Sequence, residues 1–206
     1  RYRIAPLDPH AHLFEVSVTV DQPAATGQAF TLPTWIPGSY LVREFARHFV
    51  AVRAECNGKP VAIAKTRKDM WQAAPCEGPL TVTAEVYAFD LSVRTAYLDA
   101  NRGYFNGTAV FLSPAGREHA ACIVDIVPPA GAADWEVATT LPLDGAAHVA
   151  RGVEGTVRRP AAGARLPTAA RGRAGLPVLR DRRGRLPRHR PGRRVVAVVA
   201  RRQLLA

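Results

Sequence analysis

The first 150 residues predict a mainly β fold: an antiparallel sandwich-like or curved-sheet domain with one short helical segment. Two observations predict it. Apolar and polar residues alternate in short runs, with the period of half-buried strands, and turn signals such as Asn57-Gly58 and Pro128-Pro129 separate the runs. The chain is 48% hydrophobic and has three Trp and seven Phe, so it can bury a core.

The expected strands follow in order along the chain. The clearest are HLFEVSVTVD and LTVTAEVYAFDLSV, in which every second residue through most of the run is apolar. Shorter runs ended by Pro or Gly predict further strands at AVFLSP, ACIVDIVPP and WEVATTLP. Asn106-Gly107-Thr108 matches a glycosylation sequon, but Asn-Gly is also a strong hairpin signal, and we expect a turn there.

The stretch LPTWIPGSYLVREFARHF, residues 32–49, interrupts the strand pattern. Pro37-Gly38 is typical of a type II turn, and Ser39 can cap a short helix that we expect over 39–49. This stretch is either a working site or a structural corner with solvated charges. The apolar face of the helix would hold Leu41, Val42, Phe45 and Phe49, with Phe45 and Phe49 packed inward, and its outer face Tyr40, Arg43 and Arg47.

A second dense polar and aromatic stretch is LSVRTAYLDANRGYFNGTAVFLSP, which contains Tyr104 and Asn106. Arg and Tyr favour interfaces, so this stretch could form a recognition surface. It could equally be a hairpin with ordinary cross-strand pairs.

The sequence contains no familiar catalytic signature. None of the six His is followed by Glu, and C-x-x-C, P-loop, dinucleotide and G-x-S-x-G motifs do not occur. His10 and His12 are expected on one face of a strand lead-in, where two ligands make only a weak zinc site and a solvated strand edge is the simpler interpretation. The widely spaced Cys56, Cys76 and Cys122 predict reduced core thiols.

Charge and composition divide the chain near residue 148. Residues 151–206 contain 16 Arg, one Glu and one Asp, a net charge of +14, whereas the first 150 residues carry 12 basic and 15 acidic residues, a net charge of −3. We therefore expect a domain over 1–148 and a tail over 149–206 that is disordered or results from out-of-frame translation of a GC-rich gene. The other interpretation is an arm that binds nucleic acid non-specifically. No apolar run is long enough to span a membrane.

Five stretches between Tyr2 and Leu141 are distinctive when taken together: YRIAPLDPHAHLFEVSVTV, LPTWIPGSYLVREFARHFVAVRAECNGKPV, KTRKDMWQ, VYAFDLSVRTAYLDANRGYFNGTAVFL and WEVATTL. They resemble the N-terminal domain of the glycyl aminopeptidase family, the PDZ-containing zinc metallopeptidases of family M61. The resemblance implies a β-rich first domain, then a thermolysin-like domain with a zinc-binding H-E-x-x-H helix, then a PDZ-like domain. The full enzyme would remove N-terminal Gly or Ala from peptides.

The H-E-x-x-H helix has no counterpart in this sequence. The resemblance therefore implies that this chain is a non-catalytic fragment that is inactive alone. It would hold no cofactor of its own, because the zinc belongs to the full-length family. Its partners would be the parent catalytic domain, whose substrate cleft it helps to line, and the peptide substrate of the full-length protein. The expected docking or cleft-facing surface comprises Tyr40, Arg43, Glu44, Tyr104 and Asn106.

The alternative to this function is a β-sandwich binding module with an Arg-rich nucleic-acid-binding arm. The sequence begins with Arg rather than Met, so we expect its start to be incomplete. No charged and apolar leader opens it, and we expect a cytoplasmic location.

Overall fold

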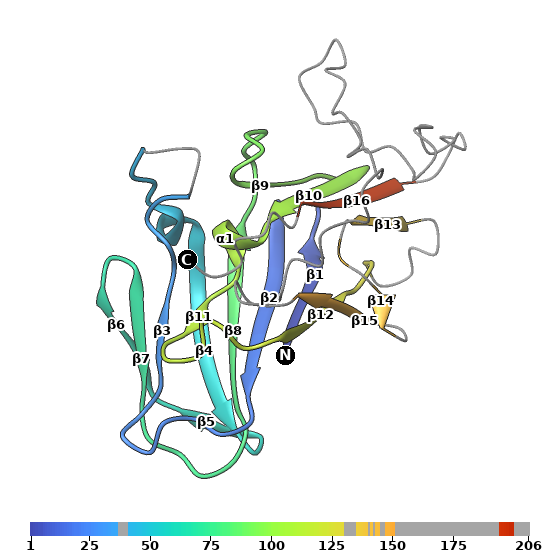
Figure 1. The fold of residues 1–206 in the computed structure, drawn as a ribbon. Coiled ribbons are helices and arrows are strands. Elements are labelled where there is room, and N and C mark those ends of the chain that lie inside the picture. The colour runs from blue at the N-terminus through green and yellow to red at the C-terminus, as the bar shows by residue number, and fades with distance from the viewer. Residues whose placement is uncertain are drawn as a thin grey trace, which may run out of the picture.

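The computed structural model describes residues 1–36, 41–129, 135–139, 141, 143–144, 147–150 and 194–199. These residues are mostly strands, with one 3-10 turn, η1 (Phe45–His48), and one α-helical turn, α1 (Gly107–Val110). The strands form three sheets (Figure 1). The mainly β, largely antiparallel fold predicted from the alternating runs is confirmed. No helix in these ranges is long and apolar enough to cross a bilayer.

The largest sheet has eight strands. Neighbouring strands are antiparallel except for β1 and β12, which run parallel, with Tyr2 opposite Val124. In order across the sheet, the strands are β14 (Leu143–Asp144), β15 (Ala147–Ala150), β12 (Cys122–Ile126), β1 (Tyr2–Asp8), β2 (Leu13–Val20), β8 (Leu80–Tyr87), β4 (Phe49–Cys56) and β5 (Lys59–Val61).

The second sheet is antiparallel and contains, in order, β11 (Ser113–Pro114), β3 (Ala29–Thr31), β7 (Met70–Ala73) and β6 (Ile63–Arg67). The third contains β13 (Trp135–Thr139), β16 (Arg194–Val199), β10 (Arg102–Asn106) and β9 (Ala96–Leu98). Strand β16 pairs in parallel with both β10 and β13. It belongs to the predicted tail, most of which lies outside the described residues, so the boundary at residue 148 stays a prediction.

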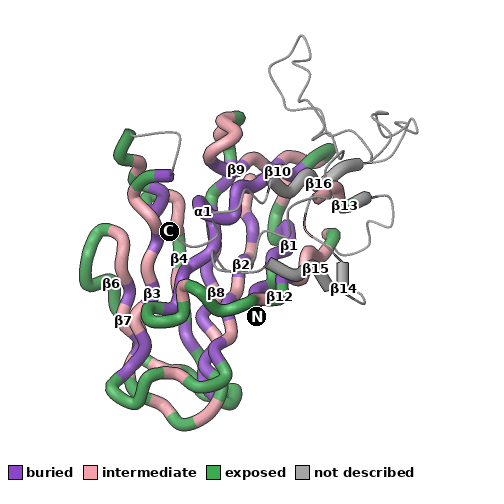
Figure 2. The backbone as a smooth tube through the Cα atoms, in the orientation of Figure 1, coloured by how far each residue is buried: buried purple, intermediate pink, exposed green. Residues whose placement is uncertain are grey.

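The alternation of β2 and β8 sets the register of the large sheet. Every second residue of β2 is buried, and β8 repeats the pattern beside it, with Phe14 opposite Val86 and Val18 opposite Val82. Because the side chains of a strand alternate between its two faces, this register places both apolar sets on one face. Buried residues accordingly follow β1, β2 and β8, while β6 is mostly exposed (Figure 2).

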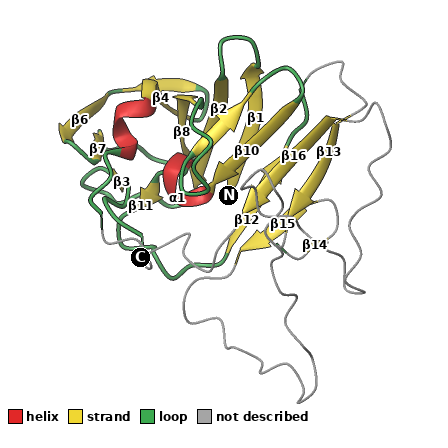
Figure 3. Cartoon of the chain, turned by 90° about the horizontal axis from the view of Figure 1, so that it is seen from above, coloured by secondary structure: helices red, strands yellow, loops and turns green. Residues whose placement is uncertain are grey.

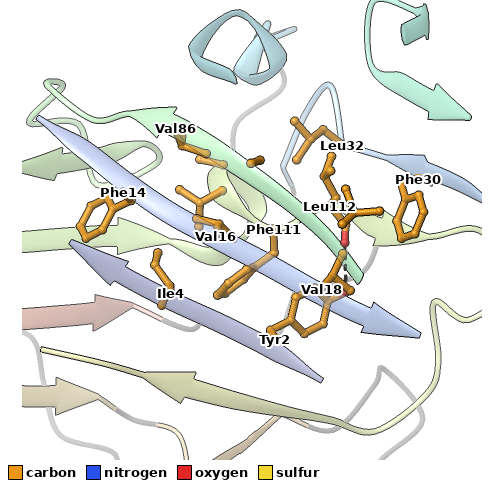
Figure 4. Packing of buried hydrophobic residues seen from close by; sticks show 14 of the residues in the cluster. Tyr2, Ile4, Phe14, Val16, Val18, Phe30, Leu32, Val86, Phe111 and Leu112 are labelled. Carbon is orange, nitrogen blue, oxygen red and sulfur yellow. Dashed lines mark hydrogen bonds between the residues drawn. The ribbon is translucent and has the colours of Figure 1, made fainter. Parts of the chain in front are cut away.

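A row of aromatic rings joins this face to the third sheet. Phe105 of β10 lies edge-on to Phe14, with ring centroids 5.9 Å apart, and to Phe111, 5.8 Å away. Phe111 in turn lies 4.9 Å from Tyr2, whose hydroxyl donates to the Leu112 carbonyl at 3.2 Å (Figure 4). Tilted and edge-to-face contacts of this kind are favourable beyond the apolar area they bury. They fix segment 111–112 over the sheet.

Two turn predictions had different outcomes. Asn57 and Gly58 form the β4–β5 hairpin turn as predicted, both with positive φ (51° and 73°). The hairpin expected at Asn106-Gly107 is wrong, because the Asn106 side chain accepts a hydrogen bond from the Thr108 amide and starts α1. Most of the AVFLSP strand is therefore absent, and only Ser113–Pro114 pair in a sheet.

The predicted helix over 39–49 is shorter than expected. Tyr40 and the predicted cap Ser39 lie outside the described residues, and 41–44 are not helical, so the turn begins after Glu44. The reason is a backbone hydrogen bond of 2.6 Å from Arg43 to the Thr34 carbonyl, which holds this segment beside residue 34.

The burial around η1 differs from the prediction in the same segment. Leu41 and Val42, expected on the apolar face, are 69% and 75% exposed, whereas Phe45 is buried as predicted.

Candidate functional site

η1 forms one wall of a pocket at the end of the large sheet where β4 begins and β8 ends. The register fixes this position, because Phe49 at the start of β4 lies opposite Val86 near the end of β8. The pocket, of about 230 Å³, is called the η1 pocket below. Its polar lining consists of Arg43, Glu44, Arg47 and His48 on one side and Asp90 and Thr95 on the other. Arg43 and Glu44 of the predicted surface therefore line a common pocket.

The β6–β7 hairpin supports the η1 wall through two lysines. Lys68 pairs with the Glu44 carboxylate at 3.0 Å, and Lys65 donates to the Ala46 carbonyl at 3.4 Å. The Lys65 ammonium also lies 4.8 Å from the centroid of the Trp71 ring, a cation–π contact. The hydrogen bond and positive charge of Lys68 lower the pKa of Glu44, so this carboxyl is ionised at neutral pH.

His48 contributes a neutral imidazole to the pocket. Arg47 Nε donates to His48 Nε2 at 3.2 Å, which requires an unprotonated nitrogen at that position. Burial lowers the pKa of His48, and the adjacent Arg47 charge lowers it further, against a smaller opposing effect of Asp90. His48 is therefore uncharged near pH 7.

The opposite wall is a loop between β8 and β9 that is closed by its own hydrogen bonds. Asp90 Oδ1 accepts from the Ser92 amide at 2.8 Å, which is an Asx turn. The Thr95 hydroxyl donates to the carbonyls of Asp90 and Ser92, at 3.1 and 2.9 Å. Asp90 and Thr95 are thus held in place before any partner binds.

Tyr104 and Asn106 support this loop from β10. The Tyr104 hydroxyl and Asn106 Nδ2 both donate to the Val93 carbonyl, the amide at 3.3 Å. Asn106 is buried, and its Oδ1 accepts from the amide and the hydroxyl of Thr108 at 3.2 and 2.7 Å. Since α1 contacts η1 (Figure 3), Asn106 links the two walls of the pocket without lining it.

Phe89, at the start of the same loop, belongs to a stack of planar side chains. Its ring centroid lies 4.0 Å from that of His12 and 5.3 Å from that of Tyr97, and Arg102 lies 5.2 Å above the Tyr97 ring. His12 Nδ1 lies 2.6 Å from the Leu98 carbonyl oxygen. His12 is therefore engaged in packing, and His10 and His12 lie in the turn between β1 and β2, not on a strand.

Exposed apolar side chains gather at the same end of the large sheet as the η1 pocket. Among the residues that the structure describes, ten large hydrophobic side chains are exposed, and seven of them lie in segments 35–50 and 87–91. Both segments reach the same end of the β4–β8 pair, the upper end in Figure 1. We call these seven the apical surface: Trp35, Leu41, Val42, Val50, Tyr87, Phe89 and Leu91.

The chemistry of the η1 pocket suits recognition. The Thr95 hydroxyl proton is committed to backbone carbonyls, and the described lining pairs no nucleophile with a base. Nor does the described part of the chain contain three or more His, Cys, Asp or Glu side chains grouped so that they could hold a metal ion. These residues therefore do not fit a zinc centre, and no catalytic step is assigned to them.

A larger pocket of about 310 Å³ lies where β1 begins and β2 ends. Its two arginines are already engaged, Arg1 with Asp125 at 2.6 Å and Arg117 with the Gln22 carbonyl. We place the candidate site at the η1 pocket instead, because the apical surface lies at the same end of the large sheet.

Comparison with known proteins identifies this architecture. The model of the Peptidase M61 N-terminal domain matches residues 1–154. The chain belongs to peptidase family M61. A crystal structure described as an aminopeptidase N family protein from Idiomarina loihiensis is 40% identical to this M61 N-terminal domain, with a TM-score of 0.70. The match covers 73% of this chain and 27% of that one, so the chain spans about a quarter of the similar protein. The search of curated proteins found no match.

The M61 match covers both stretches that the sequence singled out, residues 32–49 and the one containing Tyr104 and Asn106. Sequence reasoning did not include Asp90 and Thr95 in the site. The D-x-S pattern of an Asx turn at Asp90 was the available signal. The stack of His12, Phe89 and Tyr97 had no local signal, because the β1–β2 turn, the segment after β8 and strand β9 each contribute one residue to it.

Proposed function

We propose that this M61 domain is the non-catalytic N-terminal part of a zinc metallo-aminopeptidase of the glycyl aminopeptidase type. It packs on the catalytic domain through the apical surface and lines the substrate cleft with the η1 pocket. Zinc and its general base come from a region of the full-length enzyme that has no counterpart here. The observation that carries the proposal is the gathering of exposed apolar residues at the end of the sheet that holds this charged pocket.

Two physical arguments support a docking role for the apical surface. Monomeric soluble proteins rarely expose large contiguous apolar patches, and such patches, rimmed by polar groups, mark interaction sites. In addition, the similar protein from Idiomarina loihiensis is much longer than the matched region, which leaves ample chain for a partner domain. Arg43 and Arg47 then supply the charged rim of the interface.

The test uses a full-length family member carrying substitutions at the positions aligned with Val42 and Leu91. Changing both to Ser should lower the thermal midpoint of the full-length enzyme, because the docked surface loses apolar area. Serine at the positions aligned with Ile123 and Val137, which are exposed on other strands, is the matched control. The docking proposal fails if both double variants leave the midpoint unchanged.

The cleft-lining part of the proposal needs a separate readout. The change Arg43→Ala, at the aligned position, should raise KM for a chromogenic glycine amide several-fold while leaving the thermal midpoint close to that of the parent. If KM and turnover are both unchanged, the η1 pocket does not line the substrate cleft.

The tail supports a second candidate activity through its charge. Residues 151–206 carry a net charge of +14, enough for salt-dependent binding of nucleic acid. We expect labelled DNA to be retained at low salt by the full chain and not after deletion of 151–206. An out-of-frame tail would bind in the same way, so sequencing the gene across codon 150 must accompany this test.

We also propose a cytoplasmic location, supported by three cysteines that are all free. Detection of the protein in a periplasmic or secreted fraction would contradict it.

A further inference from the structure

Cys56 and Cys76 lie together although 20 positions separate them in the sequence. Cys56 is the last residue of β4 and is buried. Cys76 lies in the connection between β7 and β8, is partly exposed, and packs against the core. The register places Cys56 opposite Leu80, so the chain entering β8 must pass the Cys56 side chain.

Hydrogen bonds join the two segments around the Cys56 sulfur atom. The Cys56 thiol approaches the carbonyls of Glu77 and Gly78 at 3.4 and 3.6 Å, and Asn57 Nδ2 donates to the same Glu77 carbonyl at 2.9 Å. A Cβ atom at Gly78, where φ is +107°, would lie 2.5 Å from Asn57 Nδ2, which shows how closely the β4 turn and the 76–78 segment approach.

The two thiols also interact directly. Burial raises the pKa of Cys76 to about 11, and a hydrogen bond shared with the Cys56 thiol contributes to this rise. The Cys76 thiol is therefore protonated near pH 7 and reacts slowly with weak oxidants. The third cysteine, Cys122, lies on β12, and strands β1, β2 and β8 separate it from β4 in the sheet.

We propose that Cys56 and Cys76 are a dithiol modification site that a peroxide converts reversibly to an intramolecular disulfide. The partly exposed Cys76 sulfur attacks one peroxide oxygen, the O–O bond breaks, and a sulfenic acid and water form. The Cys56 sulfur then attacks the sulfenic sulfur, a second water leaves, and the S–S bond forms. Two thiols and one hydrogen peroxide give one disulfide and two waters. A small dithiol reverses the reaction by exchange.

The disulfide would close a loop that contains β5, β6 and β7. Lys65 and Lys68, which support η1, lie within this loop. Closing a loop of this length restricts the unfolded chain, and we expect the thermal midpoint to rise by roughly 5–10 °C on oxidation. The inference is independent of the proposed docking function.

The test treats the native 206-residue chain with hydrogen peroxide, blocks the remaining thiols with iodoacetamide, and maps the peptides under non-reducing conditions. The expected result is loss of two of the three free thiols, a linked Cys56–Cys76 peptide pair lacking two hydrogens, and full reversal by dithiothreitol. Cys122→Ser should behave like the parent. Cys76→Ser should form no cross-link and show no rise in thermal midpoint.

A sample oxidised after denaturation is the control, because its cysteines pair according to chain statistics and Cys122 should then appear in the linked peptides. The proposal is overturned if the native chain accumulates Cys76 sulfinic acid while Cys56 stays open to alkylation. Native cross-links that mainly involve Cys122 would also overturn it.

Discussion

Asn106 illustrates how one buried polar side chain organises the candidate site. Its carbonyl oxygen starts α1, and its amide nitrogen holds the loop that carries Asp90 and Thr95. The oxygen and the nitrogen of the side-chain amide therefore both have hydrogen-bond partners inside the protein. The Asn-Gly pair alone could not reveal this, because Asn favours helix starts and hairpin turns alike.

The change Asn106→Ala should destabilise the chain by about 1–3 kcal/mol, because it removes a helix cap and leaves the Thr108 amide and hydroxyl without this acceptor. The matched control is the exposed Asn101, whose backbone amide, not its side chain, donates to Asp99 Oδ1. Asn101→Ala should stay within about 0.5 kcal/mol of the parent. Urea midpoints measure both, and equal midpoints for the two variants would contradict the cap assignment.

His48 should make stability depend on pH. Its pKa in the folded state lies below the ordinary value of 6.5, so the unfolded chain binds more protons in the interval between the two values. Stability contributed by neutral His48 is therefore present above pH 6.5 and is lost as the pH falls.

The variant His48→Gln keeps an acceptor for Arg47 but cannot titrate. Between pH 7.5 and 5.5, the thermal midpoint of the parent should fall more steeply than that of His48→Gln. Parallel curves would show that His48 is not the titrating group.

At the scale of secondary-structure elements, the sequence correctly predicted the strands and turns that are specified by neighbouring residues. β2 and β8 follow from alternation alone, and the β4–β5 turn follows from Asn57-Gly58. The helix over 39–49 failed because a hydrogen bond to Thr34 competes with helix formation. The stack of His12, Phe89 and Tyr97 could not be predicted, since only the folded chain brings the β1–β2 turn, the segment after β8 and strand β9 together. Of the five predicted site residues, Arg43 and Glu44 line the pocket, Tyr104 and Asn106 support it, and Tyr40 lies outside the described residues.

The entry into β3 depends on glycine at position 27. Gly27 has φ +97°, and a Cβ there would lie 2.4 Å from the Ala73 carbonyl oxygen at the end of β7. Gly116 also has positive φ, +79°, but a Cβ there would meet nothing within 4 Å. Gly116→Ala should cost about 1–2 kcal/mol through backbone strain alone.

Gly27→Ala should cost roughly 1–3 kcal/mol more than Gly116→Ala, because the β3–β7 pair must separate to admit the methyl group. Denaturant midpoints of the two variants test this. If the two variants lose the same amount of stability, the clash at Gly27 is relieved without disturbing the sheet.

At the scale of the whole molecule, the apical surface should govern self-association. Val42 and Leu91 are 75% and 57% exposed, so replacing both with Ser should change stability little and weaken association of the isolated chain. The control is Ile123→Ser with Val137→Ser, at exposed sites elsewhere. Sedimentation velocity measures the effect, and equal association of the two double variants would argue against a special role for this end.

The parallel pairing of β1 with β12 has a consequence for biosynthesis. Tyr2 lies opposite Val124, so once β1 has been synthesised more than 120 further residues must follow before the large sheet can be completed. Contacts of such long sequence separation slow folding and prolong the time during which unpaired strand edges can aggregate. We therefore expect the yield of folded chain to depend on growth temperature and on chaperone capacity during translation.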